Sequence, residues 1–157
     1  MLTATALEGL PEVTPGDDLA TLIATTLTNN RQSLQQNDVL VIAHKIVSKA
    51  EGRIRRLHDV KPGDDATRLA KHLNKDPRHV QVVLDESQAV LRAERGVLIC
   101  VTHHGFVCAN AGVDASNVPG EDTVVLLPRD PDRSARELRH KLPATPAVVV
   151  TDSFGRA

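Results

Sequence analysis

Three short stretches of this 157-residue chain combine residue types that could bind a metal ion and a phosphate group. Asp114 and Asn117 lie in a turn of small and polar residues, Ser48 and Lys49 follow an apolar run, and Asp152 follows another. Carboxylate oxygens are ligands that divalent cations prefer, and lysine and hydroxyl groups donate to phosphate oxygens. The residue types therefore fit a site that holds a phosphate compound together with a metal.

Each stretch also has a plainer structural interpretation, which the residues alone leave open. Asp and Asn favour turns because their side chains bond to nearby backbone groups, and this applies to Asp114 and to Asp152. The stretch with Ser48 and Lys49 could be an exposed amphipathic turn. It is not a P-loop, because the Gly-x-x-x-x-Gly-Lys pattern does not occur there.

Alternating apolar runs and helical patterns predict the elements that position these residues. Continuous apolar runs at 39–43 and 147–151 indicate strands buried on both faces, and ligand groups gather at the C-terminal ends of such strands in open α/β sheets. Helical spacing from Leu19 to Leu27 predicts a first helix. Further expected elements are helices at 65–73, 77–93 and 133–142, the first two as an αα-hairpin, and strands at 53–57, 96–101, 105–109 and 123–127.

Two local signals refine these expectations. Asp76-Pro77 and Asp130-Pro131 each place a capping residue before a proline in the first helical position. The three arginines of the strand at 53–57 predict a solvated surface rather than a site.

Composition excludes several classes of protein. The net charge of −1 gives no basic surface for nucleic acid, and Phe106 and Phe154 are the only aromatic residues. We expect Cys100 and Cys108 to be free buried thiols. No apolar run approaches the ~18 residues of a membrane span, and the N-terminus lacks the pattern of a signal peptide. These features predict a single domain in the reducing cytoplasm, without membrane or nucleic-acid partners.

The last predicted strand is followed by only a short loop before Ala157. A domain that finished there would leave an apolar strand without a following element to cover it. We therefore expect residues 1–157 to be the N-terminal portion of a longer domain.

Two sequence motifs resemble one enzyme family. They are Ile46-Val-Ser-Lys-Ala-Glu-Gly-Arg53 and His104-Gly-Phe-Val-Cys-Ala-Asn-Ala-Gly-Val-Asp-Ala-Ser-Asn-Val118. In this order, and with further matching stretches over nearly the whole chain, they are similar to the GTP-dependent coenzyme F420-0:gamma-L-glutamyl ligases. That family is also found as the N-terminal half of a bifunctional actinobacterial enzyme.

The resemblance implies a fold, a reaction and its cofactors. The fold would be α+β, a mixed sheet with helices, in an intertwined homodimer. The enzyme would add L-glutamate to the deazaflavin coenzyme F420-0 through an acyl phosphate, releasing GDP and phosphate. It would need two Mg2+ or Mn2+ ions at each site, and K+ would assist.

The resemblance also implies roles for particular residues. Asp114 and Asp152 would bind one divalent metal and Ser153 a second. No side chain would act as a nucleophile. The residues implied to contact GTP are Leu10, Pro11, Glu12, Val13, His44, Lys49 and Asn117.

The chain departs from the family pattern in two respects. The family position of His44 more often carries Ser, Thr or Gln, although a histidine can still donate one hydrogen bond. The family also continues well beyond Phe154-Gly155-Arg156, into a region that supplies further GTP contacts and another metal ligand. Two alternatives follow: a non-catalytic module that keeps the fold and binds metal and nucleotide weakly, or a metal-dependent phosphatase or nucleotidyl enzyme.

Overall fold

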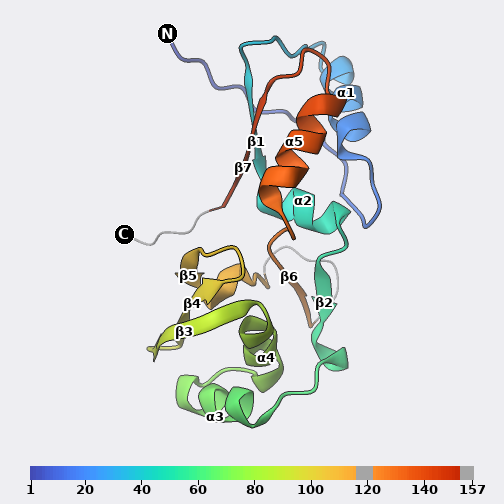
Figure 1. The fold of residues 1–157 in the computed structure, drawn as a ribbon. Coiled ribbons are helices and arrows are strands. Elements are labelled where there is room, and N and C mark those ends of the chain that lie inside the picture. The colour runs from blue at the N-terminus through green and yellow to red at the C-terminus, as the bar shows by residue number, and fades with distance from the viewer. Residues whose placement is uncertain (116–121, 153–157) are drawn as a thin grey trace. The chain divides into compact units, whose positions relative to one another are not determined.

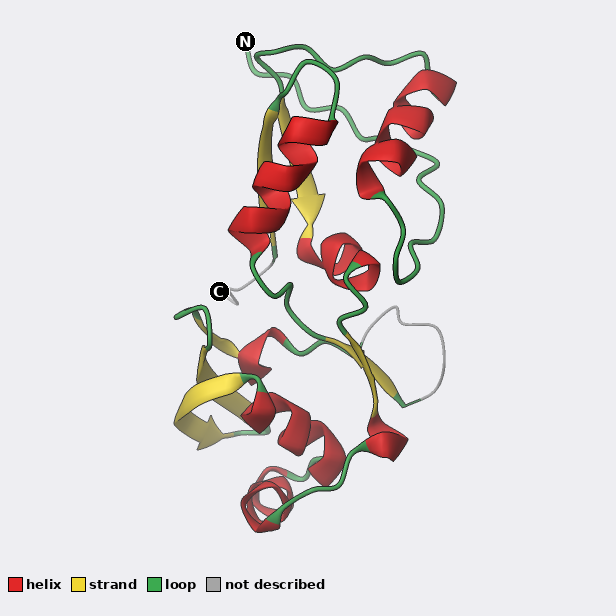
Figure 2. Ribbon diagram, turned by 45° about the vertical axis from the view of Figure 1, so that its right-hand side comes forward, coloured by secondary structure: helices red, strands yellow, loops and turns green. Residues whose placement is uncertain are grey.

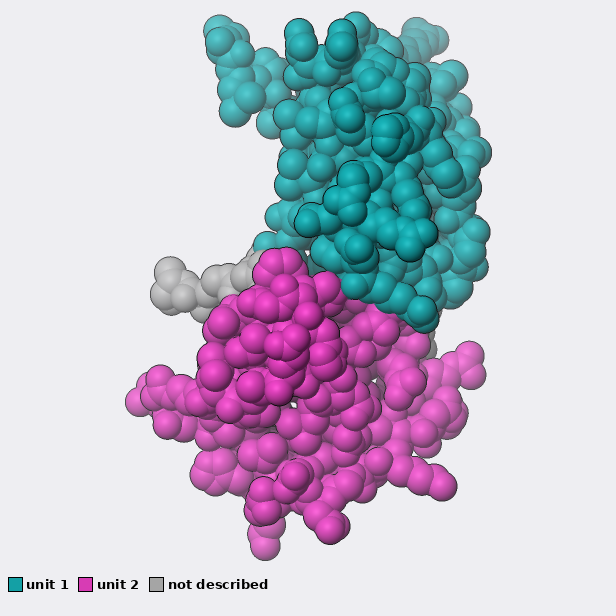
Figure 3. All heavy atoms as spheres, viewed as in Figure 1, with its two compact units in different colours: residues 1–52, 128–152 teal, residues 53–127, 153–157 magenta. Residues whose placement is uncertain are grey.

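The structure is a computed structural model, and it describes residues 1–115 and 122–152 of the chain. The chain forms two compact units, which are coloured separately in Figure 3. Unit 1 is built from residues 1–52 and 128–152, and the described part of unit 2 covers residues 53–115 and 122–127. Unit 1 is therefore assembled from two segments that are far apart in the sequence.

A pair of parallel strands with helices on one side forms unit 1 (Figures 1 and 2). Strands β1 and β7 pair in parallel, with Val41 opposite Val149. Helix α2 begins at the residue after β1, and α5 lies along β7. The bounds are α1 Leu19–Asn29, β1 Val39–Ala43, α2 His44–Ala50, α5 Pro131–Lys141 and β7 Ala147–Thr151.

The parallel strands of unit 1 are buried on one face only, so the expectation that they are buried on both faces is wrong. Leu40, Ile42, Val148 and Val150 face the core that α1 and α5 complete. The side chains on the other face are exposed, with Val41 62% exposed. A continuous apolar run is typical of a strand covered on both faces, but in the described residues helices pack on one side of this pair.

Unit 2 contains two antiparallel sheets and two helices in its described part. Strands β3, β4 and β5 form one sheet in that order, and β2 pairs with β6 in the other. Helices α3 and α4 pack against each other. The bounds are β2 Ile54–Arg56, α3 Asp64–Leu73, α4 Pro77–Asp85, β3 Ser87–Glu94, β4 Val97–Thr102, β5 Val107–Ala109 and β6 Thr123–Val125, with 3-10 turns at Leu57–Asp59 and Asn110–Gly112.

The helix expected at 77–93 is shorter than its spacing predicts. Asp76 caps α4 by accepting a hydrogen bond from the Arg78 amide at 2.8 Å, with Pro77 in the first helical position, as expected. The helix then ends at Asp85, and residues 87–94 form β3, which pairs with β4. Apolar residues in that stretch fit helical spacing and strand alternation alike, and pairing with β4 decides in favour of the strand.

The architecture is α+β, as expected from the resemblance, with parallel and antiparallel strand pairs in separate sheets. Cys100 and Cys108 are free, buried thiols opposite each other on β4 and β5, which confirms that expectation. Burial raises the pKa of the Cys100 thiol, and this disfavours the reactive thiolate. Within residues 1–115 and 122–152, no helix has the length and apolar character needed to cross a membrane.

Candidate functional site

The strand register of unit 1 brings His44 and Asp152 together. Ala43 and Thr151 are partners at the C-terminal ends of β1 and β7. The next residue of each chain segment is therefore at the same edge of the sheet, and Nε2 of His44 lies 3.4 Å from Oδ1 of Asp152. The carboxyl ends of parallel strands are the edge where ligand groups gather in α/β sheets, and here that edge carries an imidazole and a carboxylate.

Helix α2 adds a buried hydroxyl to this group. Ser48 is fully buried, and its Oγ lies 3.5 Å from Nδ1 of His44. The two residues are four positions apart on α2, so they lie on the same face of the helix. His44 is itself buried at 5% exposure. Both ring nitrogens of a buried histidine thus have a polar atom of a neighbouring side chain beside them.

Lys49 of α2 is held against the N-terminal segment. Its side chain is 8% exposed, and Nζ lies 2.5 Å from Oε1 of Glu12. The next residue in that segment, Val13, is buried, and Leu10 packs against the core of unit 1. These apolar anchors fix the loop that carries Glu12. The structure thus brings together Lys49 and residues 10–13, which the resemblance assigns to GTP.

Asp114 belongs to unit 2, where the backbone holds it firmly. Its amide and carbonyl both bond to Val125, at 2.9 and 2.8 Å. The turn before it needs a glycine, because Gly112 has a φ of +71° and a Cβ there would lie 2.7 Å from Cγ of Leu127. The half-buried Asp114 is therefore presented from a rigid turn. Asn117 and Ser153, the other polar residues expected at the site, lie outside the described residues.

The two carboxylates expected to bind metal are of a type that suits a hard divalent cation, and each lies in a different unit. Asp114 and Asp152 offer carboxylate oxygens, the ligand type that Mg2+ and Mn2+ prefer. Asp152 has a histidine beside it, as ligating carboxylates commonly have a hydrogen-bonding partner. Among the residues that the structure describes, no group of three or more His, Cys, Asp or Glu side chains is close enough to hold a metal. A metal ion at either carboxylate would therefore also need ligands of other kinds, such as hydroxyls, phosphate oxygens or water.

Sequence reasoning did not find two of these relationships. The ion pair between Glu12 and Lys49 joins residues 37 positions apart, and no local pattern encodes it. The Ser48–His44 contact has a local signal, the four-residue spacing, which becomes readable only once residues 44–50 are assigned as a helix. Arg53 was expected with Arg55 and Arg56 on a solvated surface, but it is largely buried, pairs with Glu86 and donates to the Leu127 carbonyl at 3.0 Å.

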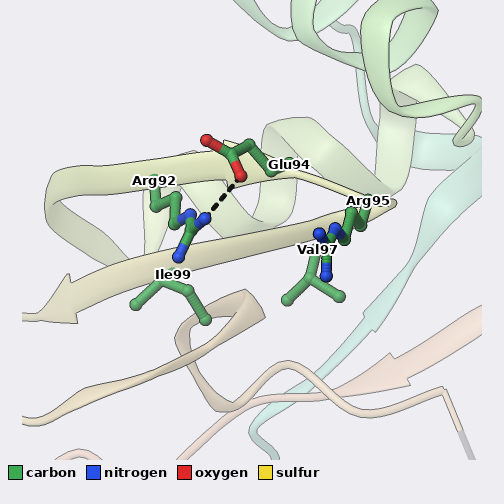
Figure 4. A pocket seen from close by; sticks show the side chains of 5 residues that line it. All are labelled: Arg92, Glu94, Arg95, Val97 and Ile99. Atoms are coloured by element: carbon green, nitrogen blue, oxygen red, sulfur yellow. Dashed lines mark hydrogen bonds and ion pairs between the residues drawn. The ribbon is translucent and has the colours of Figure 1, made fainter.

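Unit 2 also has a shallow pocket on its three-stranded sheet, shown in Figure 4. It has a volume of about 280 Å³ and is lined by residues at the turn between β3 and β4. Arg92 and Glu94, two positions apart on β3, form an ion pair at 2.6 Å among the lining side chains. The residues that line the pocket are Arg92, Glu94, Arg95, Val97 and Ile99. None of them is a residue expected to bind metal or GTP.

Comparison with known proteins identifies the family. Residues 9–157 match the model of the F420-0:Gamma-glutamyl ligase family, so the chain belongs to that family. Its relatives include the coenzyme F420:L-glutamate ligase of Methanothermobacter thermautotrophicus, 42% identical over 96% of this chain, and that of Methanopyrus kandleri, 46% identical over 92%. The ligase of the same name from Haloarcula marismortui is 42% identical over 96% of this chain.

The chain spans about three fifths of the length of these relatives. The matched regions cover 61% of the Methanothermobacter protein, 57% of the Methanopyrus protein and 60% of the Haloarcula protein. The resemblance stated from the two motifs is confirmed at the level of the family.

Proposed function

We propose that the protein is a GTP-dependent ligase that joins L-glutamate through an amide bond to coenzyme F420-0, and adds further gamma-linked glutamates. Membership of the F420-0:Gamma-glutamyl ligase family supports the reaction and the acceptor. The contact between Lys49 and Glu12 supports the nucleotide. It places a buried cation beside residues 10–13, so that two of the three places expected to contact GTP, residues 10–13 and the helix with His44 and Lys49, lie within unit 1.

The reaction needs an activated acceptor, because a carboxylate is a poor electrophile. A carboxylate oxygen of F420-0 attacks the γ-phosphorus of GTP, the bond from that phosphorus to the β–γ bridging oxygen breaks, and GDP leaves. The glutamate amine then attacks the carbonyl carbon of the acyl phosphate. The amide C–N bond forms, phosphate leaves with the former carboxylate oxygen, and the amine gives up its proton to solvent. No protein nucleophile takes part.

The protein contributes chiefly by positioning and by charge stabilisation, as in other phosphoryl transfers. Lys49 supplies a fixed positive charge for the phosphates of GTP, on a helix that keeps its side chain out of solvent. The segment with Leu10, Pro11, Glu12 and Val13, together with His44 and Asn117, contacts the nucleotide.

In this proposal Asp114 and Asp152 would hold one divalent ion, and Ser153 would contribute to a second. When bound, Mg2+ or Mn2+ neutralises charge on the phosphate oxygens and fixes their orientation. The backbone hydrogen bonds between Asp114 and Val125 fix the turn of Asp114 in unit 2, and the pairing of β1 with β7 fixes the backbone just before Asp152 in unit 1. K+ assists turnover, and the active form is a homodimer.

A turnover assay tests the proposal. The chain is incubated with F420-0, L-glutamate, GTP and Mn2+, and the products are separated and identified by mass spectrometry. We expect F420 species extended by one or more glutamyl residues, with one GDP formed for each amide bond. Replacing GTP by ATP should reduce product formation, and replacing K+ by Na+ should slow it.

Two control reactions, each lacking one substrate, distinguish this function from its alternatives. GDP formation should stop without glutamate or without F420-0. Phosphate release from GTP that continues without either would instead indicate a phosphatase, and would contradict the ligase. A stable protein that forms no product under any of these conditions would indicate the non-catalytic module.

A further inference from the structure

We infer that His44 is a positioning residue for Asp152: it orients the carboxylate for a divalent metal and is itself held by Ser48. This inference rests on the proposed function, because it assumes that Asp152 is a metal ligand. It concerns a residue whose type departs from the family pattern, and it gives that side chain a role in addition to the proposed contact with GTP.

The first step is the place of the imidazole. Nε2 of His44 faces Oδ1 of Asp152 at 3.4 Å, and the two residues follow directly on the paired ends of β1 and β7. His44 is 7% exposed in its side chain and Asp152 28%. The imidazole therefore lies on the core side of the carboxylate. A carboxylate has two oxygens, so it can contact the ring through one and a metal ion through the other.

The second step is the orientation of the ring. Ser48 Oγ lies 3.5 Å from Nδ1 and is fully buried on α2. When the Ser48 hydroxyl donates to Nδ1, that nitrogen is unprotonated and the ring hydrogen is on Nε2, the nitrogen nearer Asp152. In that tautomer one ring nitrogen accepts from Ser48 and the other carries the hydrogen that we propose orients Asp152. Partners of this kind beyond the ligands commonly set the orientation and affinity of a metal site.

The third step is the alternative that His44 binds the metal itself through Nε2. Nε2 lies 3.4 Å from the carboxylate oxygen, and in the arrangement we propose that nitrogen carries the ring hydrogen. A protonated ring nitrogen has no lone pair to give to a metal. The two roles are therefore exclusive and predict different spectra.

Mn2+ binding to the GTP-free chain tests the inference without relying on turnover. The electron paramagnetic resonance signal of unbound Mn2+ gives the dissociation constant. Asp152→Asn should abolish binding at the site. His44→Leu, which fills the space without a donor, should weaken Mn2+ binding by about 10- to 100-fold. His44→Gln should retain most of the affinity, because its amide can donate to Asp152 and accept from Ser48. Ser48→Ala should weaken binding less than His44→Leu.

A matched control and a spectroscopic measurement exclude a merely structural role. His140→Leu makes the same change at an exposed position of α5 and should leave Mn2+ affinity unchanged. Pulsed electron paramagnetic resonance of the bound Mn2+ should show no directly coordinated nitrogen.

Results that contradict this inference alone can be distinguished from results that also contradict the proposed function. Equal Mn2+ affinity in wild type and His44→Leu would overturn the inference and leave the proposed function standing, as would a coordinated nitrogen that disappears in His44→Gln. A wild-type chain that binds no Mn2+, or an Asp152→Asn variant that binds it normally, would overturn the metal site of the proposed function and this inference with it.

Discussion

Nζ of Lys49 lies 2.5 Å from Oε1 of Glu12, although the lysine side chain is 8% exposed and the glutamate side chain 63%. The pair is thus asymmetric, with a buried cation compensated by a carboxylate that reaches it from the surface. Burying an ammonium group without a partner is costly. In the GTP-free protein, Glu12 supplies the negative charge that the phosphates of GTP supply in the proposed complex.

Glu12→Gln should therefore lower the stability of the GTP-free protein and increase its response to GTP. We expect a loss of about 1 kcal/mol, less than for a fully buried pair because Glu12 is exposed and its charge is screened. Added GTP restores the missing charge, so its stabilising effect should exceed that in wild type. Thermal unfolding with and without GTP and Mn2+ measures both effects. Glu8→Gln changes an exposed carboxylate in the same segment and should have neither effect; an unchanged melting temperature for Glu12→Gln would contradict the account.

Neighbouring residues of β1 should respond very differently to substitution. Ile42 is 6% exposed in the core of unit 1, whereas Val41 on the opposite face is 62% exposed. Ile42→Ala should cost about 2–5 kcal/mol by leaving a cavity. Val41→Thr keeps the β-branched shape and should change the free energy of unfolding by about 0.5 kcal/mol or less. Urea unfolding of the two variants measures this, and equal losses would show that the face carrying Val41 is buried in solution.

The cap of α4 predicts a pH-dependent contribution to stability. The hydrogen bond from the Arg78 side chain holds the pKa of Asp76 below its ordinary value of 3.8, and the Arg78 amide also donates to it. Because folding favours the ionised carboxylate, its contribution is complete above the unfolded-state pKa and is lost as the pH falls through the lower, folded-state value. Asp76→Ala should cost about 1 kcal/mol near neutral pH.

Asp76→Asn is the matched control, because asparagine keeps the capping oxygen and removes the charge. It should lose less stability than Asp76→Ala at pH 7, and both variants should lack the acid-dependent part seen in wild type. Urea unfolding between pH 3 and pH 7 measures the difference. A wild-type curve parallel to both variants at every pH would contradict the assigned role of Asp76.

Local signals predicted much of the fold, and the errors have physical causes. The Asp-Pro starts of α4 and α5 were readable because a capping carboxylate before proline is a local signature. The end of α4 was not, because residues 87–94 adopt a strand only through pairing with β4. The burial of β1 was misjudged, since the sequence shows that Val41 is apolar but not that its face is left uncovered by the helices.

The site was also predicted only in part, because local signals identify single residues and not the contacts between distant segments. Lys49 and Asp152 stood out by residue type at the ends of apolar runs. Their partners Glu12 and His44 depend on tertiary structure, namely the anchoring of residues 10–13 and the register of β1 against β7. Sequence patterns indicate which groups can do chemistry; which of them meet depends on contacts between distant segments.

The most direct test of a GTP and metal site in this chain is a nucleotide titration followed by thermal unfolding. A ligand at a hundredfold excess over its Kd stabilises the folded state by about 2.7 kcal/mol, which for a chain of this size raises Tm by about 5–11 °C. We predict such a rise with GTP and Mn2+ together, a smaller one with ATP and Mn2+, and its loss in Lys49→Met but not in Lys141→Met, whose lysine is exposed. Equal shifts with GTP and ATP, or a full GTP shift in Lys49→Met, would contradict the account.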